Sequence, residues 1–165
     1  VLQNQVHFRP KSGLSSPLFF YITMDTLKQK IGNLIPEHMV LLDCIEMASQ
    51  SRVQIVVDGK TAVDLSTTTA IARNVRDSGL LDSVYPKGFQ LEVTSPGVDA
   101  PLIHPVQFEK NIGKRVRLKM WGESELIQVE ICHVSEKGFE GKLVNGHKDL
   151  FEFDEIESAK VEIKF

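Results

Sequence analysis

The sequence predicts an α+β protein, in which an N-terminal α/β layer domain is followed by a small all-β SH3-like barrel. Three observations predict this class. Helical and strand patterns of apolar residues alternate over the first half of the chain, and almost only strand patterns follow. Between the halves stand three prolines within ten residues, Pro96, Pro101 and Pro105, which mark a stiff connector. We therefore expect two domains that meet near Ile103.

The first half predicts the order helix, strand, strand, helix, strand. Apolar residues recur at helical spacing from Leu27 to Ile35, and Pro36 ends that pattern. Strand patterns cover residues 39–47, 52–58 and 89–94. Before the third strand, residues 64–66 offer helix caps to a second helical pattern that Gly79 ends. Helices covering one face of a three-stranded sheet would bury both patterns.

The second half predicts five strands. Residues 105–112 read as a short helix with Pro105 in its first turn. Asn145-Gly146-His147 is a hairpin signal between two strands, and a helical turn is expected at 154–158. Five short strands with a helical turn before the fifth favour an SH3-like barrel. The expected strands are 114–120, 126–134, 138–144, 148–153 and 159–165.

These patterns divide the chain into an extension (1–23), an α+β domain (24–103) and a barrel domain (104–165). The first 23 residues contain Arg9 and Lys11 and no acid. We interpret them as a disordered or non-native extension, with Met24 as the natural start. A transit peptide is the alternative, because the segment is poor in acids and carries several serines.

Composition excludes several classes of protein. The chain is 42% hydrophobic and 25% charged, which is typical of a globular protein and not of a disordered one. No stretch approaches the roughly 18 apolar residues of a membrane span. Two distant cysteines and five scattered histidines have neither disulfide-framework nor metal-ligand spacing. No nucleophile stands in a catalytic motif, so we expect no enzyme, no metal and no cofactor.

The strongest physical signal is a run of cations without an acid. It comprises Lys110, Lys114, Arg115, Arg117 and Lys119, although the whole chain has a net charge of −3. In a strand, the last three lie on one face about 6.6 Å apart, close to the spacing of successive phosphates in a nucleic acid. The run therefore predicts an RNA-binding ladder. The alternative is a solvated face whose cations pair with Glu123, Glu125 and Glu130.

A second signal is the segment Thr94 to Asp99. Pro96 suits the second position of a type II turn, and Gly97 suits the third, where φ is positive. The segment has neither the spaced glycines of a phosphate-binding loop nor the pattern around Ser95 of a nucleophile elbow. We therefore predict that Ser95, Pro96, Gly97 and Asp99 form an interdomain turn.

Two of these segments carry a resemblance to a known family. Residues 91–99, read as Leu-Glu-Val-Thr-Ser-Pro-Gly-Val-Asp and followed by Pro101-Leu102, resemble the signature that ends the first domain of the ribosome maturation factor RimP family. Residues 108–116, Phe-Glu-Lys-Asn-Ile-Gly-Lys-Arg-Val, resemble the opening of its second domain. The likeness extends from about Met24 to the end of the chain. Family members usually carry arginine where this chain has Ala100, so an RNA contact at the tip of the turn does not carry over.

The resemblance implies the expected fold and a function. It implies a cytoplasmic, non-enzymatic factor that joins the free small ribosomal subunit and assists its maturation. Its partners would be the small-subunit ribosomal RNA and a basic ribosomal protein near the decoding region. We expect a monomer. The rival hypothesis is an SH3-like adaptor that binds proteins without RNA contact. The acidic residues expected to hold the ribosomal protein are Glu123, Glu125, Glu152, Asp154 and Glu155.

Overall fold

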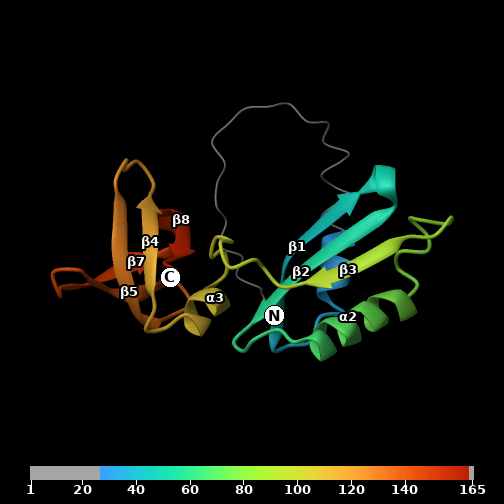
Figure 1. Ribbon diagram of the computed structural model, residues 1–165, viewed down its shortest axis with the longest axis horizontal. Helices are drawn as coiled ribbons and strands as arrows, with labels where there is room; N and C mark the ends of the chain where they lie inside the picture. Colours follow the sequence, from blue (N-terminus) through green and yellow to red (C-terminus); the bar gives the residue numbers. More distant parts are fainter. Residues whose placement is uncertain (1–26, 164–165) are drawn as a thin grey trace. The chain divides into compact units, whose positions relative to one another are not determined.

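The computed structural model describes residues 27–163, and these form an α+β protein, as predicted (Figure 1). The predicted extension 1–23, the predicted start Met24 and the last two residues of the chain lie outside the described range. Within that range the chain forms two compact units, and the boundary between them along the sequence falls between Pro96 and Gly97. The domain ranges 24–103 and 104–165 stay predictions.

The first unit has the predicted order of elements. Its three strands form one sheet in the order β1-β2-β3, with β1 antiparallel and β3 parallel to β2. A parallel pair needs a crossover, which α2 supplies. The elements are a helix at 27–32, β1 (Met39–Met47), η1 (Ala48–Gln50), β2 (Arg52–Gly59), α2 (Leu65–Asp77) and β3 (Gln90–Thr94).

The core of the first unit lies on one face of this sheet. On β2 the alternate residues Val53, Ile55 and Val57 are fully buried. Ile31 from the first helix and Ile71 from α2 join the same cluster. Both helices therefore cover the same face, as expected, and Figure 1 shows α2 lying along the sheet.

The connector after β3 forms a different turn from the predicted one. The amide of Ala100 donates to the carbonyl of Gly97 at 2.9 Å, so the turn begins at Gly97. The φ of Gly97 is not in the left-handed region, and a type II turn with this glycine third is therefore wrong. After this turn the chain runs beside the last strand, β8 (Ile156–Val161). The side chain of Leu102 is buried, and its amide donates to the carbonyl of Ala159 at 2.8 Å.

The second unit contains a single antiparallel sheet with the strand order β7-β6-β5-β4-β8. Among the described residues β7 and β8 do not pair, so the sheet is not closed and the SH3-like barrel is not confirmed. The predicted helix 105–112 is shorter in the structure. The elements are α3 (Pro105–Lys110), β4 (Arg115–Met120), β5 (Leu126–Val134), β6 (Gly138–Leu143), β7 (Lys148–Glu152), η2 (Phe153–Glu155) and β8 (Ile156–Val161).

The bounds predicted for the last two elements, 154–158 and 159–165, are wrong. A bulge in the pairing of β4 with β8 explains the difference, because Met120 pairs with Ile156 and Lys119 with Ser158. The bulge leaves Ile156 and Ala159 buried at a spacing of three residues. A spacing of three is typical of a helix, so the sequence pattern predicted a helical turn where β8 begins.

Aromatic residues fill the core of the second unit. The ring of Phe108 on α3 lies 5.1 Å from that of Phe139 on β6 and 4.9 Å from that of Phe153 in η2. These rings pack on the inner face of the sheet with Val116 and Leu118 of β4. The helix thus covers one face of the sheet near β5, and the polar residues of the strands are left on the other face.

Candidate nucleic-acid interface

The three cations of β4 share one face of the second sheet. Val116 and Leu118 are fully buried, and the residues that alternate with them, Arg115, Arg117 and Lys119, point the other way. Strand geometry spaces these three residues by about 6.6 Å. The part of the predicted ladder that lies in the strand is thus an ordered row.

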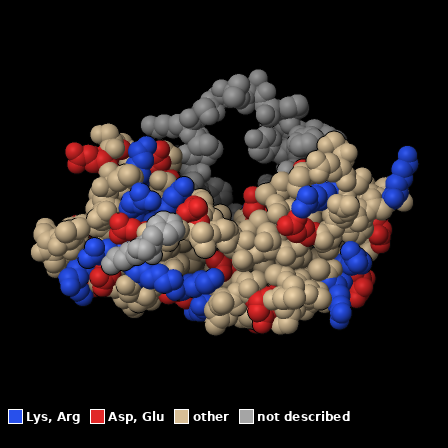
Figure 2. Space-filling model, in the orientation of Figure 1, with Lys and Arg blue, Asp and Glu red and all other residues tan. Residues whose placement is uncertain are grey.

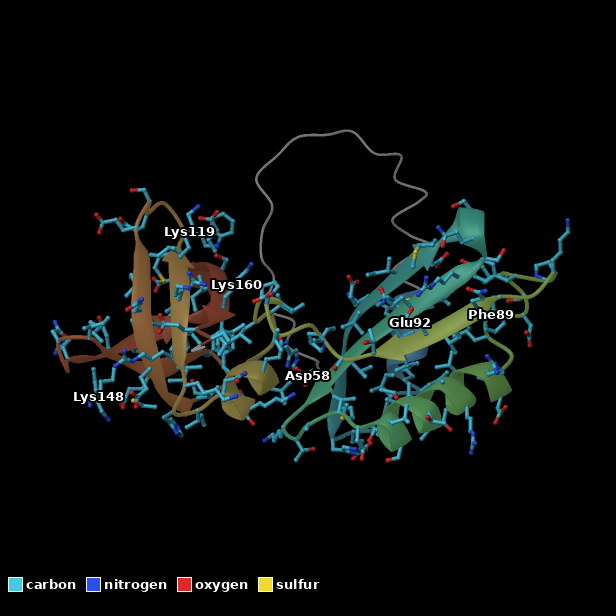
Figure 3. All side chains as sticks on the ribbon, in the orientation of Figure 1. Asp58, Phe89, Glu92, Lys119, Lys148 and Lys160 are labelled. Atoms are coloured by element: carbon cyan, nitrogen blue, oxygen red, sulfur yellow. The ribbon has the colours of Figure 1, made fainter. Side chains whose placement is uncertain are left out.

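Neighbouring strands add cations to this row. Lys160 on β8 is the direct partner of Arg117, and Lys142 on β6 is the partner of Lys148 on β7. Figure 3 labels Lys119, Lys148 and Lys160, which come from three different strands. Figure 2 shows blue Lys and Arg atoms gathered over the unit that contains β4–β8. We call the following six residues the cationic face: Arg115, Arg117, Lys119, Lys142, Lys148 and Lys160.

Two members of the cationic face are neutralised by acids. Lys119 pairs with Glu157, with 2.9 Å between Nζ and Oε2. Lys148 pairs with Glu140 at 2.7 Å, and the hydrogen bond between them raises the pKa of Lys148 and lowers that of Glu140. Both pairs are partly or well exposed to water, so each contributes little to stability.

The other four members, Arg115, Arg117, Lys142 and Lys160, are exposed and make no salt bridge with any residue of 27–163. Arg117 and Lys160 lie directly opposite each other on neighbouring strands, an arrangement in which like charges repel. An anion placed between them would relieve that repulsion. This arrangement therefore favours a negatively charged ligand.

The structure does not bring all five predicted RNA-binding residues together. Lys110 is the last residue of α3, away from the strand row. Lys114 precedes β4 and its Nζ donates to Oδ1 of Asn111 at 3.0 Å. By strand alternation Lys114 belongs to the side of Val116, opposite the cationic face. A role of these two lysines in RNA binding stays a prediction.

Sequence reasoning missed three members of the cationic face, namely Lys142, Lys148 and Lys160. Lys142 and Lys148 flank the hairpin signal at residues 145–147, and their pairing follows once the hairpin register is known. For Lys160 no local signal exists, because its position opposite Arg117 depends on the pairing of strands distant in sequence.

Acidic residues gather at one end of the second sheet. Glu123 and Glu125 lie in the loop between β4 and β5, and Asp154 and Glu155 lie in η2. A hydrogen bond of 2.9 Å from the amide of Trp121 to the carbonyl of Glu155 holds the start of that loop beside η2. All four acids are exposed, and we call them the acidic end. The fifth predicted residue, Glu152, ends β7 directly before η2 and is also exposed.

Two pockets lined by residues of the described range adjoin the cationic face. One, of about 330 Å³, is lined by Asp99 of the connector together with Arg117, Lys160 and residues 161–163. Asp99, the last residue of the signature segment, thus lies beside the cationic face within the second unit. The other pocket, of about 140 Å³, is lined by Arg115, Gln128, Val129, Glu130, Lys142, Leu143 and Val144.

Residues 27–163 present neither a cluster of metal ligands nor a membrane-spanning helix. Within residues 27–163, no three His, Cys, Asp or Glu side chains come close enough to hold a metal ion. In that range, too, none of the helices combines the length and the apolar character needed to cross a membrane.

Comparison with known proteins identifies the family. The sequence model of the RimP N-terminal domain matches residues 30–99, a range that ends with the signature segment. The ribosome maturation factor RimP of Mycobacteroides abscessus is 32% identical over 139 residues, which cover 78% of this chain and 71% of that protein. The chain belongs to the RimP family.

A second relative extends the match over the second unit. The ribosome maturation factor RimP of Christiangramia forsetii is 29% identical over 155 residues, which cover 84% of this chain and 99% of that protein. Since the RimP N-terminal domain alone accounts for residues 30–99, this alignment reaches well beyond it. The family resemblance of residues 91–99 is thereby confirmed.

Proposed function

We propose that this RimP family protein is a non-enzymatic, cytoplasmic factor that binds the small ribosomal subunit and assists its maturation. In this proposal the cationic face holds phosphates of the small-subunit ribosomal RNA. The observation that carries the RNA contact is the pair Arg117 and Lys160, two cations opposite each other on neighbouring strands that make no salt bridge with any residue of 27–163. Membership in a family of ribosome maturation factors supports the ribosomal partner.

The acidic end is the proposed binding surface for a basic ribosomal protein. Glu123, Glu125, Asp154 and Glu155 are exposed at one end of the sheet, with Glu152 beside them. A basic ribosomal protein near the decoding region is complementary to such a surface, and complementary charge mainly speeds encounter and fixes register. The negative charge of the whole chain would limit binding to unrelated RNA. The protein acts as a monomer with domains 24–103 and 104–165.

The strand order supports an SH3-like barrel as the fold of the second unit. The sequence predicted five strands with a helical turn before the fifth, and in the structure the fifth strand, β8, follows the 3-10 turn η2 and pairs with the first, β4. Curling of the sheet around Phe108 and Phe139 would bring its edges toward each other. The barrel serves here as a scaffold, and it presents the cationic face on its outer surface.

Co-sedimentation with immature small subunits tests the proposal. Association of the full chain should be strong at low salt and weaken steeply as salt rises, because each phosphate contact releases counterions. The double variant Arg115→Glu, Arg117→Glu should lose most of this binding. The slope of log affinity against log salt should fall by about 1 for each lost phosphate contact.

A matched control has the same change of charge in the first unit. Arg73→Glu, Lys87→Glu alters two exposed cations that are not on the cationic face, and it should bind almost as the unaltered protein does. If both double variants lost binding to the small subunit equally, the change in net charge alone would explain the loss. Unchanged binding in the β4 double variant would instead favour the rival, an adaptor that binds protein without RNA contact.

A further inference from the structure

Glu130 is an acid in the middle of the cationic face. It lies on β5, where its direct partners are Arg115 on β4 and Lys142 on β6. Its carboxylate makes no hydrogen bond or salt bridge with any residue of the described range. A carboxylate at this place repels a phosphate, so phosphate binding does not explain its presence.

Glu130 lines the pocket of about 140 Å³ together with residues of mixed chemistry. Arg115 and Lys142 supply hydrogen-bond donors, and Gln128 supplies an amide, one proton of which already goes to Oε1 of Glu162 at 3.2 Å. Val144, which is 75% exposed, forms an apolar rim. Phosphate oxygens only accept hydrogen bonds, whereas the edge of a nucleobase both donates and accepts. The mixture therefore fits a base better than a phosphate.

We propose that this pocket holds one unpaired base of the bound RNA, and that Glu130 selects guanine. The inference rests on the proposed RNA contact of the cationic face. The Watson–Crick edge of guanine offers two adjacent N–H donors, which one carboxylate accepts together. In a duplex this edge is occupied, so the base must be unpaired. Arg115 and Lys142 line the pocket on the two sides of Glu130. In this proposal they also attract the neighbouring phosphates, which offsets the repulsion between Glu130 and the RNA backbone.

Recognition by an edge does not require aromatic stacking. The ladder is followed by one exposed aromatic residue, Trp121, and it lies at the end of β4 beyond the pocket. Binding of single strands without sequence preference depends on such stacking. Reading of a base by hydrogen bonds depends instead on fixed donors and acceptors, which a paired sheet provides. The competing explanation, that Glu130 only neutralises Arg115 and Lys142, predicts no preference among bases.

Binding of short RNA strands to the full chain tests the proposal. The probes are labelled nine-residue strands of uridine with one central guanosine, inosine or adenosine, compared at one low salt concentration. We expect about tenfold tighter binding of the guanosine probe than of the adenosine probe, the range that one bidentate contact supplies. Inosine, which lacks the second N–H donor, should fall between them. Glu130→Gln should reduce the preference to about one.

Glu140→Gln is the matched control. Glu140 lies on the same sheet face, and its loss changes the charge of that face by the same amount, but it does not line the pocket. Both variants should bind all probes somewhat more tightly, and only Glu130→Gln should lose the preference for guanosine. A preference that is absent from the unaltered protein, or that persists in Glu130→Gln, overturns the proposal.

The same assay separates this proposal from the proposed function. If all probes bind equally, and Arg115→Glu, Arg117→Glu abolishes that binding, the RNA contact stands and the base pocket falls. If the unaltered protein binds no probe and no immature small subunit at low salt, both proposals fall together.

Discussion

Gly138, the first residue of β6, has no room for a side chain. A Cβ atom there would approach the backbone carbonyl oxygen of Phe151 on the paired strand β7 and lie 3.0 Å from the Cα of Glu152. Backbone atoms in a sheet cannot move aside as a flexible side chain does. Glycine is thus required at this position by the close packing of two strands and not by an unusual φ. The pattern of apolar residues in the sequence does not predict this requirement.

We predict that Gly138→Ala lowers the free energy of unfolding of the second unit by about 1–3 kcal/mol, the usual cost of overpacking. Hydrogen exchange of the peptides that cover β6 and β7 measures this loss. Gly97→Ala is the control, because a Cβ at Gly97 meets nothing within 4 Å and its φ is not in the left-handed region. Gly97→Ala should change stability by less than about 0.5 kcal/mol. A larger loss in Gly97→Ala than in Gly138→Ala would refute this view of the two glycines.

The start of helix α2 depends on one exposed carboxylate. Asp64 occupies the N-cap and accepts a hydrogen bond from the amide of Thr67 at 2.8 Å. The hydrogen bonds from Thr67 and Ser66 lower the pKa of Asp64 from 3.8 to about 2. Because the pKa is lower in the folded state, the carboxylate stabilises the fold above pH 3.8, and that contribution is lost as the pH falls toward 2.

We therefore predict that Asp64→Ala destabilises the first unit at neutral pH and that the difference from the unaltered protein shrinks between about pH 4 and pH 2. Urea unfolding followed by circular dichroism at several pH values measures it. Asp77→Ala, at the other end of α2, removes an exposed acid without removing a cap and should not destabilise at neutral pH. If the difference in the free energy of unfolding between Asp64→Ala and the unaltered protein stayed constant down to pH 2, the carboxylate of Asp64 would not be the stabilising N-cap of α2.

At the level of elements, local patterns predicted most of the strands and helices. Alternation identified β2 and β4 because each buries every second residue on one side. It failed at residues 153–165, where the bulge opposite Lys119 and Met120 breaks the period of two. Local preference also failed at the connector, where Leu102 is buried and the turn spans residues 97–100. In both places a distant contact overrides a local preference.

At the scale of the whole molecule, each compact unit has its own hydrophobic core. The cluster around Ile55 contains only residues of the first unit, and the cluster around Leu118 contains only residues of the second. Both side chains are fully buried. Because neither of these two clusters, drawn from residues 27–163, includes residues of both units, loss of packing in one core should be felt mainly by the elements around it.

We predict that Leu118→Ala lowers the stability of the second unit by about 2–5 kcal/mol and leaves the first nearly unchanged. Ile55→Ala should have the reverse effect. Hydrogen exchange resolved by peptide measures both units in the full chain, and each variant is the control of the other. Equal loss of protection in both units after either substitution would show that they unfold as one.

The sequence by itself determined the α+β class, the order of elements in the first unit, the row of cations on β4 and the family resemblance. Each of these depends on residues that are close together in the chain. Only the tertiary structure decided that Lys160 lies opposite Arg117, that Lys142 and Arg115 flank Glu130, and that Lys114 bonds to Asn111. The physical reason is strand register. A shift of one residue turns every side chain to the opposite face, and contacts between distant segments set that register.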